Sequence, residues 1–288
     1  MPNLQLFAVT PAGPQPLPIA ADATALDDLY RGLAPGVYSS LRTFEHNKFL
    51  YLEHHLARTV TSMQQLGWPY RLNEERLRQA IHKVCTAAPW PDMRVRIDVL
   101  AESAHALGTN SRELIGLMPF TPLPATLYTQ GVTVDFAAGI LRSQPLVKTA
   151  AFVEQRKGFA VGTPDAYERL LTDADGFILE GLSSNFYAIQ QGVVRTAGVN
   201  VLEGITRKIV LALITQMNLP LRLEALHKNE LAALDEAAIS SSSRGIVPVV
   251  AIGGVGIGNG HPGPLFARLR TAYDAFVAHT IQLAIAEA

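Results

Sequence analysis

The sequence predicts an α+β fold, because strands that pair through short turns are mixed with amphipathic helices. Two turns are clearest: Asp175-Gly176 and Gln191-Gly192 each lie between two short segments rich in apolar residues, as in hairpins. Elsewhere, apolar residues recur at helical spacing, as they do from Leu52 to Leu66. Strands and helices do not alternate regularly, so we do not expect a doubly wound parallel sheet.

The first half of the chain is expected to combine strands with two main helices. The strands are expected at 3–9, 37–44 and 93–100. The last one alternates apolar with charged residues, so we expect a half-buried strand with Arg96 and Asp98 on its polar face. One helix should end at Gly67 and the next should open at Asn73. The proline-rich segment before Gly36 should be mostly loop, with one short helix near Asp27.

Residues 119–126 contain three prolines and form the best linker candidate. They divide the chain into a smaller domain of residues 1–118 and a larger domain of residues 127–288. In the larger domain, strands are expected near 131–137, 167–172, 177–179, 184–190, 193–196, 237–239 and 247–252. Helices are expected near 149–160, at 206–217 and from about Pro264.

Composition excludes several classes of protein. Hydrophobic residues make up 48% and charged residues 17% of the chain, which does not fit a disordered protein. The net charge of -1 disfavours a general nucleic-acid or membrane-surface binder. The single cysteine, Cys85, excludes an internal disulfide framework. The first residues show no secretion signal, so we expect a cytoplasmic protein.

Two conspicuous motifs have ordinary interpretations. The glycine-rich run Gly253–Gly260 lacks the G-x-G-x-x-G spacing and a Gly-Lys-Ser/Thr ending, so it favours a hairpin turn over a phosphate loop. A nicotinamide dehydrogenase has no other support. The pair His54-His55 lies on a helix, where adjacent residues point about 100° apart and do not share one face, so a metal site is disfavoured. A packing or hydrogen-bonding role at the helix start is expected for His55 instead.

Two other segments could bind an anion. Ser240 to Ser243 follow an apolar strand, and their hydroxyls and N–H groups could form a phosphate or carboxylate cradle; a plain polar loop is the alternative. Gly204-Ile205-Thr206 opens a helix, whose free N–H groups favour an anion; an ordinary threonine cap is the alternative.

Two titratable residues could carry chemistry. Lys148 is one of six lysines and lies in an apolar segment without a nearby acid, where burial would lower its pKa and free its amine as a nucleophile. A surface lysine with a buried stem is the alternative. Glu180 ends a strand beside a turn of small residues and could pair with a cationic ring nitrogen, or could be an exposed turn acid.

The order of these motifs resembles the class IV, or fold type IV, aminotransferases, which use pyridoxal 5'-phosphate. That family includes branched-chain and D-amino acid aminotransferases and aminodeoxychorismate lyase. The similarity extends over about residues 36–275. The matching segments are Gly36 to Tyr38, Glu53 to Arg58, Lys148, Asp175 to Gly181, Ser183 to Tyr187, Leu202 to Arg207, Ser240 to Ser243 and Ile246 to Val249. The resemblance implies a two-domain α+β fold like that of D-amino acid aminotransferase.

The resemblance also implies roles for individual residues. Lys148 would form the Schiff base with the cofactor, and Glu180 would pair with its pyridine nitrogen. The other cofactor-binding residues would be Arg58, Ile205, Thr206, Ser241 and Ser242 at the phosphate and Leu202 against the ring. Tyr38 would face the reaction, and the N–H groups of Ser242 and Ser243 would receive the substrate carboxylate. Arg244 would lie close to the substrate pocket, where the family usually has a small residue.

The function implied is transfer of an amino group between an amino acid, with a branched-chain substrate as one option, and a 2-oxo acid. A lyase that releases pyruvate through the same lysine is an alternative. A degenerate member that binds the cofactor without turnover is a weaker one, because Lys148, Glu180, Arg58 and Thr206 are all retained. The family's Thr-Arg-Gly after a strand is replaced by Val99-Leu100-Ala101, which leaves the substrate open. The resemblance also implies a homodimer.

Overall fold

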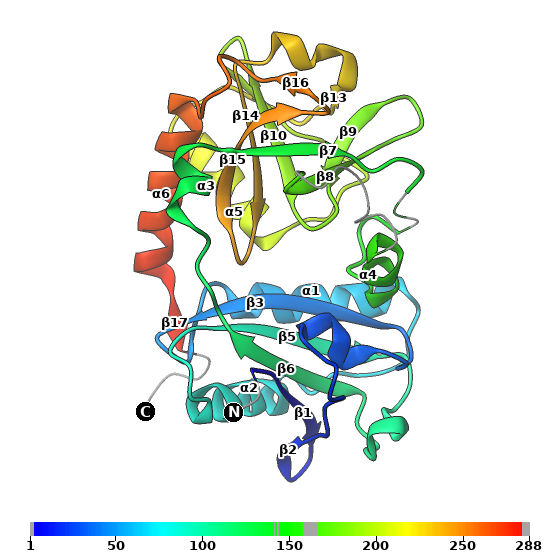
Figure 1. The fold of residues 1–288 in the computed structure, drawn as a ribbon. Helices are drawn as coiled ribbons and strands as arrows, with labels where there is room; N and C mark the ends of the chain where they lie inside the picture. The colour runs from blue at the N-terminus through cyan, green and yellow to red at the C-terminus, as the bar shows by residue number, and fades with distance from the viewer. Residues whose placement is uncertain (1–2, 141, 143, 158–165, 284–288) are drawn as a thin grey trace. The chain divides into compact units, whose positions relative to one another are not determined.

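The fold is described from a computed structural model, for residues 3–140, 142, 144–157 and 166–283 (Figure 1). The chain forms two compact units, and each is described by itself. The first unit consists of Met1–Thr121, Val147–Val153 and His279–Ala288. The second unit consists of Pro122–Leu146 and Glu154–Ala278. Lys148 therefore belongs to the first unit, although it follows the first part of the second unit along the chain.

The first unit is built on a seven-stranded sheet in the order β17-β4-β3-β5-β6-β1-β2. Its strands are β1 (Gln5–Thr10), β2 (Gly13–Pro16), β3 (Gly36–Phe44), β4 (Lys48–Phe49), β5 (Met93–Leu100), β6 (Glu113–Pro119) and β17 (Gln282–Leu283). Every described pairing is antiparallel. Apolar residues of α1 (Leu52–Gln65) and α2 (Glu74–Ala87) form one buried cluster with the central strands. The unit also contains the short 3-10 helices η1 (Leu26–Tyr30) and η2 (His105–Leu107).

Local signals located these helices correctly. The Asn73 side chain accepts a hydrogen bond from the Arg76 N–H at 2.9 Å and caps α2, as predicted. The short helix near Asp27 is η1. Strands β2 and β6 were not predicted; β6 contains Gly116 and ends at Pro119, two residue types that weaken a strand signal.

The prediction that β5 is half-buried is wrong. Arg96 is 2% exposed and Asp98 is fully buried, and only Arg94 is exposed. The Arg96 guanidinium donates to both carboxylate oxygens of Asp98, at 2.7 and 2.8 Å, and to Asp27 at 2.5 Å. A charged residue can therefore face the interior here because a buried partner satisfies it.

The second unit is built on a ten-stranded sheet, with β16 paired to β15 beside the main order β12-β11-β10-β14-β15-β7-β8-β9-β13. The first five strands along the chain are β7 (Val132–Phe136), β8 (Glu168–Thr172), β9 (Phe177–Gly181), β10 (Asn185–Gln190) and β11 (Val193–Arg195). They are followed by β12 (Leu221–Arg222), β13 (Leu226–His227), β14 (Glu236–Ser241), β15 (Gly245–Ile252) and β16 (Val255–Gly256). A buried apolar cluster joins β7, β8, β10, β14 and β15.

The helical elements of the second half are α3 (Ala125–Thr129), α4 (Ala150–Lys157), α5 (Ile205–Gln216), η3 (Lys228–Ala233) and α6 (Pro264–Thr280). Helix α3 begins inside the segment predicted as a linker. The end of the helix predicted near 149–160 lies outside the described residues.

Both predicted hairpins are present in the second unit. Gly176 has φ of 92° in the β8–β9 turn, and Gln191 and Gly192 have φ of 52° and 75° between β10 and β11. The glycine-rich run also forms a hairpin turn: Gly253 and Gly254, at φ of 55° and 82°, join β15 to β16. The described pairings therefore agree with the α+β prediction.

Candidate active site

The residues predicted to form the site fall into one group in each unit. The first unit contains Tyr38, Arg58 and Lys148. The second unit contains Glu180, Leu202, Ile205, Thr206, Ser241, Ser242, Ser243 and Arg244.

Lys148 lies beside Tyr38. The Tyr38 N–H donates to the Lys148 carbonyl oxygen at 3.0 Å, and an isolated bridge pairs Val37 with Thr149. The Lys148 Nζ lies 4.7 Å from the centre of the Tyr38 ring. Strand β3 thus fixes the backbone of the lysine, and the face of an aromatic ring is close to its amine.

Arg58 approaches the same strand from helix α1. Its Nη2 donates to Ser39 Oγ at 3.1 Å and lies 3.5 Å from His55 Nδ1. Burial, followed by the nearby charges of Arg58 and Lys148, holds the pKa of His55 well below its ordinary value. His55 is therefore a neutral, buried residue, and the cationic groups Arg58 and Lys148 belong to one neighbourhood of the first unit.

The buried Arg96–Asp98 pair lies behind Tyr38. Register pairs Tyr38 with Asp98 across β3 and β5. The Arg96 guanidinium lies 4.3 Å from the Tyr38 ring centre and 4.1 Å from that of Tyr30. Tyr38 is 6% exposed and is held by these contacts. Sequence reasoning missed this support, because it placed Arg96 and Asp98 on a solvent-facing side.

In the second unit, Glu180 is a buried carboxylate and not an exposed turn acid. It is 3% exposed, and its Oε2 accepts hydrogen bonds from Asn185 Nδ2 at 3.3 Å and from the Leu202 N–H at 3.2 Å. Its Oε1 lies 2.9 Å from Arg142 Nη1. Two hydrogen bonds and one ion pair therefore orient this buried carboxylate.

The start of α5 is joined to this carboxylate through Asn185. Asn185 Nδ2 also donates to the Leu202 carbonyl at 2.9 Å, and Leu202 precedes the helix by three residues. Gly204 caps the helix without a side-chain hydrogen bond. Ile205 and Thr206, at 2% and 3% exposed, form the first buried turn. Gly204 has no side chain to accept from the N–H groups of this turn, and N–H groups at a helix start favour an anion.

The serine segment lies next to Asn185 because β10 pairs with β14. The register places Asn185 opposite Ser240. Ser240 and Ser241 are the last residues of β14. Of the four serines expected in a loop, only Ser242 and Ser243 therefore lie in one. Ser240 is buried, and its Oγ lies 2.9 Å from the Tyr187 hydroxyl. The second unit thus brings together a buried carboxylate, a helix N-terminus and a serine turn.

Arg244 follows the serine turn and contacts protein acceptors. Its Nε donates to Ser241 Oγ at 2.8 Å, and its Nη2 donates to Ser183 at 2.8 Å. Both terminal nitrogens also donate to Glu168 Oε2 at 3.2 Å. Neither Ser183 nor Glu168 was among the predicted site residues, because both partners are distant from Arg244 along the chain.

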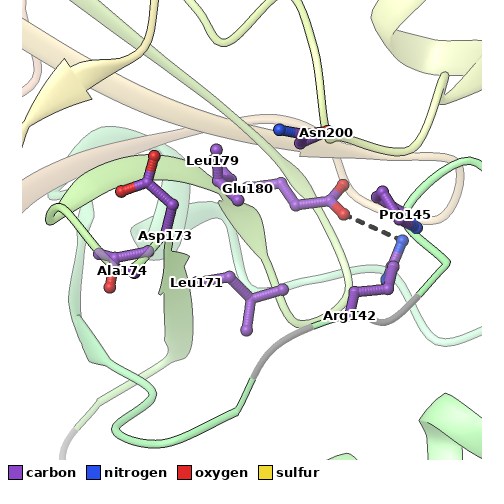
Figure 2. A pocket seen from close by; sticks show the side chains of 9 residues that line it. Arg142, Pro145, Leu171, Asp173, Ala174, Leu179, Glu180 and Asn200 are labelled. Atoms are coloured by element: carbon purple, nitrogen blue, oxygen red, sulfur yellow. Dashed lines mark ion pairs between the residues drawn. The ribbon is translucent and has the colours of Figure 1, made fainter.

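A cavity of about 310 Å³ borders Glu180 within the second unit (Figure 2). Arg142, Asp173 and Asn200 also line it, and Figure 2 shows Arg142 reaching the Glu180 carboxylate. Of the predicted site residues, only Glu180 lines this cavity. Arg142 was not predicted as a site residue. Its partner Glu180 is distant in the sequence, so nothing near Arg142 in the chain indicates the ion pair.

The described part of the chain contains no group of three or more histidine, cysteine, aspartate or glutamate residues that could hold a metal ion. Among the same residues, no helix combines the length and apolar character needed to cross a bilayer.

Comparison with known proteins assigns the family. The model of the family "Amino-transferase class IV" matches residues 36–252. The chain is 28% identical over 262 residues to a D-alanine aminotransferase of Bacillus licheniformis, covering 87% of this chain and 90% of the relative. A second D-alanine aminotransferase, from Staphylococcus haemolyticus, is 35% identical over 102 residues, which are 35% of this chain and 36% of that protein.

Solved structures agree on the fold. The T.th. branched-chain amino acid aminotransferase with pyridoxamine 5'-phosphate superposes with a TM-score of 0.78 at 19% identity, covering 98% of each chain. A putative branched-chain enzyme from Thermotoga maritima gives 0.75 at 21% identity, over 96% of this chain and 97% of that one. The family match extends over most of the sequence, and the fold is that of the same enzymes. The chain therefore belongs to the class IV aminotransferases, a family of pyridoxal-phosphate-dependent enzymes with fold type IV.

Proposed function

We propose that this enzyme transfers the amino group of a small D-amino acid, such as D-alanine, to a 2-oxo acid, and that Lys148 holds its cofactor. The observation that carries the substrate assignment is the match to a D-alanine aminotransferase over 87% of the chain. A branched-chain substrate is the alternative, favoured by the titles of the similar structures.

The described residues of the second unit fit pyridoxal phosphate. A phosphate needs N–H donors, and α5 begins at a glycine without a side-chain cap. A Cβ at Gly204 would lie 2.2 Å from Asn185 Oδ1, so the chain approaches this turn too closely for a side chain. A protonated ring nitrogen needs an anion, and Glu180 is a buried carboxylate with two fixed donors on its Oε2.

When bound, the cofactor supplies an electron sink for the electrons released at the substrate α-carbon. Glu180 would keep the ring nitrogen protonated, and Leu202 would pack against the ring. The N–H groups of Ile205 and Thr206 would hold the phosphate. The other phosphate ligands would be Arg58, Ser241 and Ser242.

The Lys148 amine would hold the cofactor covalently and, once the substrate amine has replaced it, would be free to move the proton at the α-carbon. Its position supports this role, because the Tyr38 N–H donates to the Lys148 carbonyl and so fixes the backbone of the lysine. Tyr38 would face the reacting atoms. The N–H groups of Ser242 and Ser243 would receive the substrate carboxylate.

The remaining organisation is also proposed. Residues 1–118 would form the small domain, 119–126 the linker and 127–288 the cofactor-binding domain, apart from residues 147–153 and 279–288, which belong to the first unit. Family resemblance supports a homodimer, and a cytoplasmic location stays a prediction.

A half-reaction screen tests the proposed substrate. The holoenzyme is mixed with matched D- and L-forms of alanine, valine and leucine, without a 2-oxo acid, and the cofactor's visible band is followed. We expect D-alanine to remove the band faster than L-alanine, and a 2-oxo acid to restore it. Faster reaction with L-leucine would favour the branched-chain alternative. Continuous pyruvate release without an acceptor would contradict amino-group transfer.

A further inference from the structure

The Arg244 guanidinium connects two turns of the second unit. One turn is Leu182 to Ser184, between β9 and β10, directly after the Glu180 strand. The other is Ser242 to Arg244, between β14 and β15. Arg244 donates at 2.8 Å to both the carbonyl and the hydroxyl of Ser183 in the first turn, and at 2.8 Å to Ser241 Oγ beside the second.

A buried acid fixes this guanidinium. The Glu168 side chain is 6% exposed, and its Oε2 accepts from Arg244 at 3.2 Å, from Ser183 Oγ at 2.5 Å and from Ser184 Oγ at 3.3 Å. The Arg244 side chain is itself only 15% exposed. Because both charges are largely removed from water, each needs the other, and the guanidinium has little freedom to move towards a substrate.

The backbone of the second turn is fixed as well. The Arg244 N–H donates to the Ser241 carbonyl at 3.2 Å, and the Tyr128 hydroxyl donates to the Arg244 carbonyl at 2.9 Å. Gly245 follows at φ of 62°, a left-handed conformation that suits a three-residue hairpin loop. Side-chain and backbone contacts together set the position of Ser241.

The bond from Arg244 also orients the Ser241 hydroxyl. Because Nε donates to Ser241 Oγ, the oxygen acts as an acceptor in this contact, and its own proton remains available for another partner. A hydroxyl polarised by a neighbouring cation is a stronger donor towards an anion.

We propose that Arg244 is a positioning residue for the phosphate-binding serine turn, and that it acts through Ser241 without touching the substrate. This inference rests on the proposed assignment of Ser241 to the cofactor phosphate. It differs from the role expected from the sequence, in which Arg244 lies at the substrate pocket, because its donors are directed at Glu168, Ser183 and Ser241.

The test compares binding of pyridoxal phosphate with binding of pyridoxal, which lacks the phosphate, to the full-length apoenzyme. Arg244→Lys keeps a positive charge for Glu168 but has no Nε–H for Ser241. Arg244→Ala removes both. Arg195→Lys and Arg195→Ala are matched controls, because the Arg195 side chain is also 15% exposed and pairs with an acid, Glu230, in the same unit.

We expect both Arg244 variants to raise the Kd for pyridoxal phosphate by about tenfold, a loss typical of one hydrogen bond involving a charged group. The Kd for pyridoxal should stay within about twofold, and the Arg195 variants should leave both values unchanged. The 31P resonance of the bound phosphate should also shift in Arg244→Lys. The melting temperature is measured for every variant. If Arg244→Ala does not fold, the two Kd values of Arg244→Lys alone test the inference.

Three results would overturn the inference. An equal loss of affinity for both forms would indicate a general structural role. An unchanged Kd for pyridoxal phosphate combined with loss of the amino-acid half-reaction would place Arg244 at the substrate. If the wild-type apoenzyme bound pyridoxal phosphate no better than pyridoxal, the phosphate site itself would be wrong, and the proposed cofactor assignment would fail with it.

Discussion

The closeness of Gly204 to Asn185 leads to a specific prediction. Gly204 has φ of −64° and ψ of 140°, a conformation open to any residue, so Gly204→Ala introduces no backbone strain. The added Cβ would lie 2.2 Å from Asn185 Oδ1. The Asn185 side chain is 6% exposed and must move.

The structure sets the magnitude of the effect. If Asn185 moves, its Nδ2 loses the bonds to the Leu202 carbonyl at 2.9 Å and to Glu180 at 3.3 Å. Two buried hydrogen bonds contribute about 1 kcal/mol each, and the loss of a favourable helix cap adds a few tenths. We expect Gly204→Ala to lower the free energy of unfolding by about 2–3 kcal/mol and to weaken pyridoxal phosphate binding.

Urea unfolding of the apoenzyme measures the first effect and a cofactor titration the second. Gly256→Ala is the matched control, because a Cβ there has no heavy atom within 4 Å and no positive φ. The double variant Gly204→Ala/Asn185→Ala should lose less stability than the sum of the single variants, since it removes the clashing oxygen. If Gly204→Ala and Gly256→Ala have the same free energy of unfolding and the same affinity for the cofactor, the added Cβ does not displace Asn185.

Three further predictions concern the first unit. Asp98→Asn should lower the free energy of unfolding by about 1.5–3 kcal/mol, because the buried Arg96 guanidinium then keeps only Asp27 as a charged partner; urea unfolding measures this. Burial holds the pKa of His55 well below 6.5, so only the unfolded chain gains this proton as the pH falls. The free energy of unfolding should therefore decline below about pH 6.5, by at most about 1.4 kcal/mol per pH unit. Urea unfolding at several pH values should show that His55→Gln lacks this contribution to the decline. Burial raises the pKa of the Cys85 thiol to about 12, so a thiol reagent at neutral pH should label it only after unfolding.

Each of these three predictions can be contradicted by a specific outcome. A loss below about 1 kcal/mol for Asp98→Asn would mean that Asp27 alone satisfies the buried Arg96 guanidinium. A His55→Gln profile parallel to the wild type would assign the acid sensitivity to other groups. Rapid labelling of Cys85 in the folded enzyme would contradict its burial.

The predictable part of the fold depended on signals close together in the sequence. Helix α2 was predicted from Asn73 and its apolar stripe, and the β8–β9 hairpin from Asp175-Gly176. Each signal acts over a few residues, because caps and turns are satisfied locally. Strand β6 lacked such a signal. A side chain at Gly116 would meet Tyr30, Leu29 and Leu26, which are far from it along the chain.

The unpredictable part of the candidate site depended on partners far apart in the chain. Arg96 and Asp98 alternate with apolar residues, a pattern that normally indicates a solvent-facing side. Their burial depends on Asp27 and Tyr30, nearly seventy residues away. Glu168 and Arg244 are separated by 76 residues, so their pairing also follows only from the folded sheet.

Lys148 is the residue on which the proposed chemistry depends most. The most direct test is reduction of the full-length holoenzyme with borohydride, followed by proteolysis and mass spectrometry of the labelled peptide. We expect one phosphopyridoxyl group, on Lys148 and on none of the other five lysines, and no labelled peptide from Lys148→Ala. A label on another lysine, or a wild-type enzyme that binds the cofactor without forming a reducible bond, would contradict this expectation.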